Sequence, residues 1–440
     1  MTWRPRFSTA ALAAVVALAL VLVAAVLALG RSTEPSGRTV VSVRLWDQQV
    51  AAAYRESLAA FTREHPGIEV RVEVVSYASY FDTLRTDVAG GGAADIFWLN
   101  NSRLAEYADN SRLLPVASDP DWDPSVVAQF TRGGSLWGVP QLTDAGIALY
   151  YNADLLDAAG ISAAELGAAR WDPDPARDTL RALLARLTVD NRGKPSTATG
   201  FDPRAVRQWG YNAANDLQGI TLNFIGSAGG VFDSGDRFAF DNPQAVAALG
   251  YVVDLINRDH VAPPASDTND NGDFSRNQFL SGRMAVFQSG TYNLAQIADQ
   301  ARFRWGVTML PTGPAGRVSV TNGIVAAGNS ATRHPEAVRT VLDWLGSAEG
   351  NAYLGRRGAA IPAVRPAQRA YFDYWDGRGV DVAPFFRVLD GPRIPAPGGA
   401  GFAAGYLAIK PFFDEMFLGR RPVGPTLAAA QQAANAAATR

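Results

Sequence analysis

A strand–helix–strand pattern over residues 40–75 constrains the fold more than any other feature of the sequence. The run VVSVRLW (40–46) is β-branched and alternates, Ala51–Glu64 repeats apolar residues at helical spacing, and IEVRVEVV (68–75) forms a second alternating run. Two strands joined across a helix lie parallel in one sheet, with the helix packed on a sheet face. The sequence therefore predicts an α/β fold.

A further cycle of the pattern indicates where a ligand would bind. A helical stretch at Tyr80–Ala89 is followed by three glycines and by the buried strand ADIFWL (94–99). Ligands of open α/β sheets bind beyond the carboxyl ends of the strands. We therefore expect the residues after the first and third strands to face a ligand: Trp46, Asp47, Gln48, Asn100 and Asn101.

Composition excludes several classes of function. The 440 residues are 48% hydrophobic and 19% charged, which suits one large core or two smaller ones. The formal net charge is −2, so the chain lacks the surplus of Lys and Arg that binding to nucleic acid requires. Cysteine is absent, which excludes disulfides, thiolate catalysis, Cys-ligated metals and the anchor thiol of a lipoprotein.

The N-terminus predicts export. After Arg4 and Arg6 comes AALAAVVALALVLVAAVLALG (10–30), an apolar run long enough to span a bilayer as a helix. Residues 1–30 are either a signal peptide cleaved after Ala28-Leu29-Gly30 or an uncleaved membrane anchor, and 31–38 form a short linker. The protein is expected outside the cytoplasm, extracellular or at the cell surface.

The order of several segments resembles a known family. The runs WDQQ (46–49), GGAADIFWLNNSRLAEYADNSRLLPV (91–116), LWGVPQLTDAGIALYYNADLLDAAGI (136–161) and FLSGRMAVFQSGTYN (279–293) follow one another as in the extracellular sugar-binding proteins of ATP-driven importers, the maltose-binding-protein-like group. The resemblance covers residues 40–435. No single run is diagnostic; the ordered set carries the resemblance.

The resemblance implies two α/β lobes of type II with crossed connectivity, which close like a hinge on a ligand between them. It places residues 38–143 and 304–346 in the first lobe, and 147–300 and 350–440 in the second. The crossings would fall at 142–146, 301–304 and 346–350, all polar or small-residue stretches. The implied partners are a carbohydrate ligand and the transmembrane permease subunits of an ABC importer, with a monomeric binding protein and no nucleic acid.

A sugar site combines aromatic rings, which stack on C–H faces, with Asp, Asn and Gln, which hydrogen-bond hydroxyl groups. Residues of these types stand at segment ends along the chain. In addition to the five residues above, the candidates are Tyr80, Asp144, Trp209, Asn223, Gly290, Tyr292, Asn322, Gly323 and Phe402. In the family, the segment around Gly290 often carries a tryptophan that stacks on sugar; the ring here is Tyr292.

Enzyme and metal interpretations are weaker. The chain has three histidines and lacks a nucleophile elbow, a phosphate-binding GxxxxGK[ST] loop and an HExxH helix; only a carboxylate pair of a glycan-active enzyme stays open. The run DTNDNGDFSRNQ (267–278) resembles a calcium loop but ends on Gln278 in place of Glu, so we expect a polar loop whose Asp273 caps the next helix. The sequence thus predicts a sugar-binding protein without catalysis, metal or cofactor. A binder of polyols, glycerophosphodiesters or polyamines is the alternative.

Overall fold

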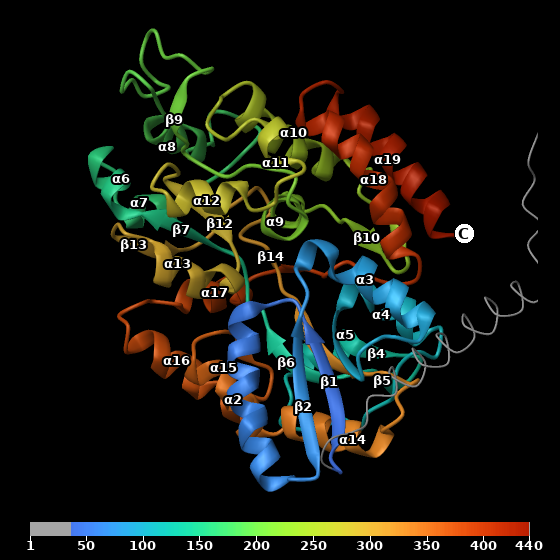
Figure 1. Ribbon diagram of the computed structural model, residues 1–440. Coiled ribbons are helices and arrows are strands. Elements are labelled where there is room, and N and C mark those ends of the chain that lie inside the picture. Colours follow the sequence, from blue (N-terminus) through green and yellow to red (C-terminus); the bar gives the residue numbers. More distant parts are fainter. Residues whose placement is uncertain (1–36, 440) are drawn as a thin grey trace, which may run out of the picture.

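A six-stranded sheet organises the first lobe (Figure 1). The computed structural model describes residues 37–439. The sheet has the strand order β16-β6-β15-β3-β1-β2, in which β1 is parallel to both β2 and β3, while β15 and β16 run antiparallel to their neighbours. The elements of the first lobe are β1 (Thr39–Leu45), α2 (Gln48–Glu64), β2 (Ile68–Val74), α3 (Tyr77–Gly90), β3 (Ile96–Asn100), α4 (Asn101–Ala108), α5 (Pro124–Phe130), β4 (Thr131–Arg132), β5 (Ser135–Leu136), β6 (Val139–Thr143), β15 (Gly323–Gly328), α14 (Pro335–Leu345), α15 (Ala348–Arg356) and β16 (Ile361–Pro362).

The predicted β–α–β unit is confirmed, and its register explains its burial. Val41 of β1 pairs with Val70 of β2, and Val41, Val43 and Leu45 point into a core that α2 covers. Since β2 and β3 flank β1 on opposite sides, the two crossover helices α2 and α3 lie on opposite faces of the sheet. The carboxyl ends of β1, β2 and β3 consequently meet at one edge.

A smaller antiparallel sheet, β12-β7-β13, organises the second lobe (Figure 1). Helices surround it, and α18 packs along α19. The elements are β7 (Ala148–Asn152), α6 (Ala153–Ala158), α7 (Ala163–Gly167), α8 (Leu180–Leu187), β8 (Val189–Asp190), β9 (Val206–Gln208), a π-helical turn (Leu217–Thr221), α9 (Leu222–Ser227), β10 (Asp233–Ser234), β11 (Arg237–Phe238), α10 (Pro243–Asn257), α11 (Ala265–Thr268), α12 (Phe274–Leu280), β12 (Val286–Ser289), a 3-10 turn (Thr291–Asn293), α13 (Leu294–Gln300), β13 (Trp305–Thr308), β14 (Ser319–Val320), α16 (Arg369–Asp376), α17 (Ala383–Arg387), β17 (Arg393–Ile394), α18 (Phe402–Phe417) and α19 (Val423–Ala438).

The chain passes between the lobes at segments that lie side by side. Strand β6 leads through residues 144–147 into β7, and β14 leads through 321–322 into β15. The backbone N–H of Asp144 donates to the carbonyl of Asn322 at 2.9 Å, which joins the two crossings. Strand β16 pairs with β6 next to them, Ile361 opposite Thr143. These neighbouring strands form a narrow connection about which the lobes can rotate.

Two of the expected segment boundaries are wrong. Strand β13 (305–308) was expected in the first lobe, but it pairs with β7 of the second, so the return crossing lies at 321–322 and not at 301–304. Helix α15 and strand β16 were expected in the second lobe, but α15 packs on α2 and β16 joins the six-stranded sheet. The last crossing therefore follows Pro362. Polar, small-residue stretches mark loops in general, and only strand pairing shows which loops change lobe.

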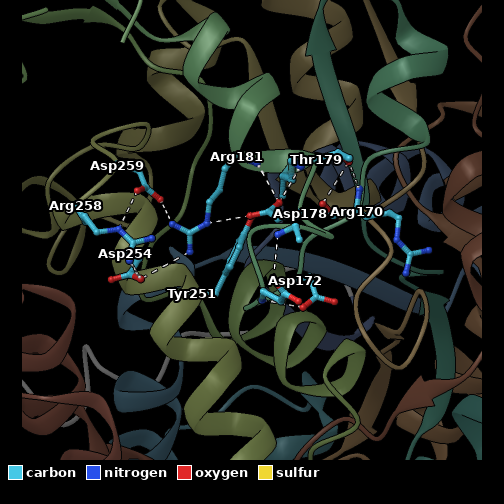
Figure 2. A network of polar contacts seen from close by, with 12 residues as sticks. Arg170, Asp172, Asp178, Thr179, Arg181, Tyr251, Asp254, Arg258 and Asp259 are labelled. Carbon is cyan, nitrogen blue, oxygen red and sulfur yellow. Dashed lines mark hydrogen bonds and ion pairs between the residues drawn. The ribbon is translucent and has the colours of Figure 1, made fainter. Parts of the chain in front are cut away.

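An ion-pair network fastens α8 to α10 inside the second lobe (Figure 2). Arg181 pairs with Asp178 at 2.9 Å, with Asp254 at 3.7 Å and closely with Asp259. Its guanidinium carbon lies 4.3 Å from the ring centroid of Tyr251, whose hydroxyl donates to Asp178 at 3.2 Å. Since every member of the network bonds to another member, its role is structural. None of the predicted site residues belongs to it.

The predicted export segment, residues 1–30, and most of the linker 31–38 lie outside the described residues. Within 37–439, no helix has the length and apolar character needed to cross a membrane.

Candidate functional site

The end of β1 supplies the first side chains of the candidate site. The strand stops at Leu45, and Asp47 caps α2 by accepting hydrogen bonds from the N–H groups of Gln49 at 2.8 Å and Val50 at 3.0 Å. Trp46, between Leu45 and Asp47, is part-buried, and its ring packs edge-on against that of Tyr77. Gln48 begins α2 and points to solvent. The predicted position after the first strand is therefore occupied by a ring and a carboxylate.

Tyr77 extends this wall, and Tyr80 does not. Tyr77 starts α3, is 58% exposed and lies with its ring centroid 5.6 Å from that of Trp46. Tyr80, one helical turn later, is fully buried: its hydroxyl donates to the carbonyl of Trp98 at 3.0 Å and accepts from the N–H of Trp98 at 2.9 Å. The prediction of Tyr80 as a ligand contact is wrong, because this ring ties α3 to the sheet.

The end of β3 contributes at two different places. Asn100 is part-buried and lies close to Tyr77. Asn101 instead crosses to the other lobe, where its Nδ2 donates to the carbonyl of Ala396 at 3.1 Å. A Cβ atom on Gly398 would come within 2.7 Å of that same Nδ2, so the Pro/Gly loop 391–402 closes directly onto Asn101. This loop is a contact between lobes.

Asp144 stands on the first crossing, where the two lobes meet. Its Oδ2 accepts a hydrogen bond from Nε2 of Gln218 at 3.1 Å, and its carbonyl accepts from the hydroxyl of Thr291 at 3.1 Å. Gln218 belongs to the π-helical turn of the second lobe. Asn322 lies beside Asp144 on the neighbouring crossing. Asp144 and Asn322 thus stand together on the two crossings, where the lobes join.

The second lobe presents Tyr292 from the turn after β12. Tyr292 is 41% exposed. Burial of its hydroxyl raises the pKa of Tyr292, and the charges of Asp216 and Asp144 raise this pKa further. Tyr406 of α18 responds in the same way: its pKa is raised by burial, by Asp216 and by Tyr77 of the opposite lobe. The charge of Asp216 therefore acts on rings from both lobes, those of Tyr77, Tyr292 and Tyr406.

Tyr77 and Tyr292 are partly enclosed by protein and partly open to solvent. Burial raises the pKa of Tyr77 even though more than half of the residue is accessible to solvent. This combination is expected where protein packs around a side chain that solvent still reaches on one side. Tyr292 shows the same combination. Tyr77 and Tyr292 are therefore crowded by protein and still reached by solvent at the boundary between the lobes, which is the candidate ligand cleft.

The cleft is acidic. Burial raises the pKa of Asp144 to about 6, and the neighbouring charge of Asp47 adds to the shift. The pKa values of Asp47 and Asp216 are also raised by burial, although each accepts backbone hydrogen bonds that oppose the change. Arg103 of α4 is the cation whose charge acts on Tyr77 and Tyr406. Desolvation dominates all three carboxyl groups, as expected for acids that face a partly closed space.

Several predicted residues lie elsewhere. Trp209 bridges Met284, at the opposite end of β12 from Tyr292. Asn223 is buried and holds backbone, donating to the carbonyls of Gln218 and Gly219 and accepting from Val320. Phe402 is 6% exposed and stacks on Phe238 at 5.4 Å. These three are corrections, because core packing and backbone hydrogen bonding use the same residue types as sugar binding.

Gly323 and Gly290 are both buried, for different reasons. Gly323 donates its N–H to Oε1 of Gln129 at 3.1 Å, and a Cβ there would come within 2.6 Å of Val126. It packs β15 on α5 and does not reach the cleft. Gly290 lies directly under the ring of Tyr292, and its φ of −90° is open to any residue. The turn after β12 therefore does not need glycine for its backbone shape.

Sequence reasoning missed five residues that the structure brings together: Tyr77, Arg103, Asp216, Gln218 and Tyr406. The sequence pattern could have indicated Tyr77, since this residue comes shortly after the end of β2, as Trp46 comes after β1. Of the other four, Arg103 and Tyr406 stand inside helices, Gln218 lies in the π-helical turn and Asp216 just before it, and none belongs to a distinctive pattern. The 267–278 loop holds another correction: the Asp273 side chain makes no capping hydrogen bond and pairs with Arg276 at 3.0 Å. Within residues 37–439, no cluster of three His, Asp or Glu side chains is arranged to hold a metal.

A hinged two-lobe α/β fold with aromatic rings and carboxylates gathered between the lobes defines a class, the binding proteins that enclose a small solute. The particular family follows from comparison. The family model described as "Bacterial extracellular solute-binding protein" matches residues 46–352, and the chain belongs to this family. The resemblance and the two-lobe fold predicted from the sequence are confirmed.

Known relatives agree with this assignment. The crystal structure of M. tuberculosis UspC is similar over 90% of this chain and 100% of its own, with 68% identity and a TM-score of 0.74. The Listeria monocytogenes substrate-binding protein Lmo0181, in complex with cycloalternan, shares the fold at 18% identity, with a TM-score of 0.77 over 91% of this chain and 98% of its own. A probable ABC transporter-binding protein of Deinococcus radiodurans is 28% identical over 290 residues, 64% of this chain and less than two thirds (62%) of that relative.

Proposed function

We propose that this protein is the extracytoplasmic solute-binding component of an ABC importer and that it captures a sugar or small oligosaccharide in the cleft between its lobes. The observation that carries the proposal is the composition of the cleft. Tyr77 and Tyr406 approach from opposite lobes, and Tyr292, Asp144 and Asp216 lie beside them. Rings can stack on the C–H faces of a sugar while carboxylates accept hydrogen bonds from its hydroxyl groups.

The two-lobe arrangement supports delivery to a permease. A ligand that contacts both walls stabilises the closed form, and closure presents one defined surface to a membrane partner. The Listeria protein of the same fold holds the oligosaccharide cycloalternan, which supports a carbohydrate in such a cleft. The family and these relatives are binding proteins, so we infer binding without turnover as the activity of this chain.

The charge of the cleft narrows the range of possible ligands. Three carboxylates face the cleft against one nearby guanidinium, that of Arg103. An anionic solute such as a glycerophosphodiester would meet repulsion here, since like charges in a desolvated site repel strongly. A polyamine is the second candidate, favoured by these same carboxylates and by rings that can receive a cation on their faces.

Isothermal titration tests the proposal. The exported protein would be titrated with neutral mono-, di- and trisaccharides, polyols, polyamines and a glycerophosphodiester, and the mixtures then analysed for products. We expect heat with a neutral saccharide and unchanged saccharide afterwards. Heat with polyamines alone, lost on Asp216→Asn, would replace the sugar by the cation. Cleaved saccharide would favour a glycan-active enzyme instead.

The membrane attachment of the protein is open to a separate test. We propose that residues 1–30 either are removed on export or remain as an anchor. The mass of the N-terminus of the protein isolated from cells distinguishes the two, because only a retained helix leaves residues 1–30 in place.

A further inference from the structure

The ring of Tyr292 lies across the backbone of Gly290. A Cβ atom built on Gly290 would come within 2.3 Å of Cε1, 2.8 Å of Cδ1 and 3.1 Å of Cζ of that ring. Contacts as short as the first two do not occur between real atoms, so the ring can occupy this place only above a glycine. Cδ1 and Cε1 form one edge of the ring and Cζ stands at its end, so this edge of the ring lies over the glycine.

The backbone at Gly290 does not explain the glycine. Its φ is −90° and its ψ is −179°, an extended conformation that alanine adopts without strain. Positive φ, the usual reason for glycine in a turn, is absent here. The requirement for a small residue at 290 therefore comes from the space that the ring of Tyr292 occupies.

The turn around Gly290 is fixed by bonds that no side chain at 290 would touch. The hydroxyl of the buried Tyr150 donates to the carbonyl of Gly290 at 2.8 Å. Thr291 donates its hydroxyl to the carbonyl of Asp144 at 3.1 Å, and Nδ2 of Asn293 donates to the hydroxyl of Ser289 at 2.8 Å. An added methyl group at 290 would leave these bonds in place. The ring of Tyr292, which is 41% exposed, is the part that must move, because its side chain can rotate while the backbone of the turn is held.

We propose that Gly290 is a positioning residue: it seats the ring of Tyr292 in the orientation that faces the cleft, and thereby sets the platform on which the ligand stacks. The second part rests on the proposed function, whereas the first concerns this chain alone. Tyr292 is anchored through Thr291 to the first crossing between the lobes, so the platform keeps its place relative to the hinge when the lobes move.

The ring position can be measured without any ligand. Fluorotyrosine would be incorporated at residue 292, and separately at 406, in the full-length chain held in detergent, and its ¹⁹F spectrum compared in the parent, Gly290→Ala and Gly272→Ala. Gly272 is a matched control, since nothing lies within 4 Å of a Cβ there and its φ is not positive. We expect Gly290→Ala to move the signal of residue 292 and not that of 406, and Gly272→Ala to move neither. A signal at 292 that is unchanged by Gly290→Ala overturns the proposal.

Binding supplies the second readout, with the saccharide panel as probe. We expect Gly290→Ala and Tyr292→Ala each to weaken binding about tenfold, as loss of an aromatic anchor does. The double variant should bind no more weakly than Tyr292→Ala, since the glycine acts only through the ring. Losses that multiply would show that Gly290 acts by another route. Undiminished binding by Tyr292→Ala would instead remove Tyr292 from the ligand site and overturn the second part of the proposal. The ¹⁹F spectra alone would then decide whether Gly290 positions the ring.

Discussion

The two walls of the cleft are built by different means. The first-lobe wall consists of residues at or shortly after strand ends: Trp46 and Asp47 after β1, Tyr77 at the start of the helix that follows β2, and Asn100 as the last residue of β3. The second-lobe wall consists of Asp216 before a π-helical turn, Tyr292 in a 3-10 turn and Tyr406 inside α18. Parallel strands bring all their carboxyl ends to one edge, whereas the antiparallel strands β7, β12 and β13 alternate in direction. A strand-end rule therefore finds the first wall and misses most of the second.

The largest expected effect is on the free energy of unfolding, and it distinguishes aromatic rings in the core of each lobe from rings that face the cleft. Tyr80→Ala in the first lobe and Phe402→Ala in the second should each lower the free energy of unfolding by about 3–5 kcal/mol, because each removes a buried aromatic ring. Tyr77→Ala, in the same helix as Tyr80 but exposed, should change it by less than about 0.5 kcal/mol. Urea denaturation followed by circular dichroism measures all three. A stable Tyr80→Ala protein that had lost only its ligand would return Tyr80 to the site.

The next effect tests whether both walls hold the ligand. Tyr77→Ala and Tyr406→Ala should each weaken saccharide binding about 10- to 100-fold, or about 1.4–2.8 kcal/mol, because each removes a stacking surface. Tyr406→Phe keeps the ring and should retain most of the affinity. Trp209→Ala is the control for an aromatic residue remote from the cleft. Titration calorimetry gives the dissociation constants. Loss confined to one wall would mean that the ligand is bound by a single lobe.

The same contrast explains how far the sequence could be read. Periodicity predicted β1, α2 and β2, and the order of segments predicted two lobes, because apolar spacing and segment order reflect local and whole-chain constraints respectively. The sequence could not distinguish Tyr77 from Tyr80, since both are tyrosines on one helix and only the packing of α3 buries Tyr80. It placed β13 in the wrong lobe because pairing with β7 depends on contacts about 150 residues apart, which no local pattern records.

A smaller effect concerns the carboxyl group between the walls. Burial raises the pKa of Asp144 to about 6, above the ordinary value of 3.8 that it has in the unfolded chain. The folded state therefore holds a proton more tightly, and this contribution to stability is fully present below about pH 4 and lost as the pH rises through about 6. Asp144→Asn should raise the free energy of unfolding at pH 7.5 by about 1–2 kcal/mol and leave it nearly unchanged at pH 4. Equal gains at both pH values in urea titrations would show that the desolvated charge is not the cause.

The smallest effect tests the place where the walls touch without a ligand between them. Asn101 donates across 295 residues to the carbonyl of Ala396, a bond that exists only while the lobes are together. Asn101→Ala should therefore weaken ligand binding by about 0.5–1.5 kcal/mol through the closed form, even if Asn101 never touches the ligand.

Asn110→Ala is the matched control, since the Nδ2 of Asn110 donates to Glu106 within the first lobe. Small-angle scattering should show a larger radius of gyration for Asn101→Ala without ligand and the parental radius for Asn110→Ala. Gly398→Val should reproduce the opening, because a side chain at 398 occupies the space that Asn101 enters. The contrary outcome is that Asn101→Ala weakens binding while Asn101→Ala and Gly398→Val both keep the parental radius of gyration; that result would make Asn101 a direct ligand contact. The end of β3 would then contribute to the first wall as the ends of β1 and β2 do.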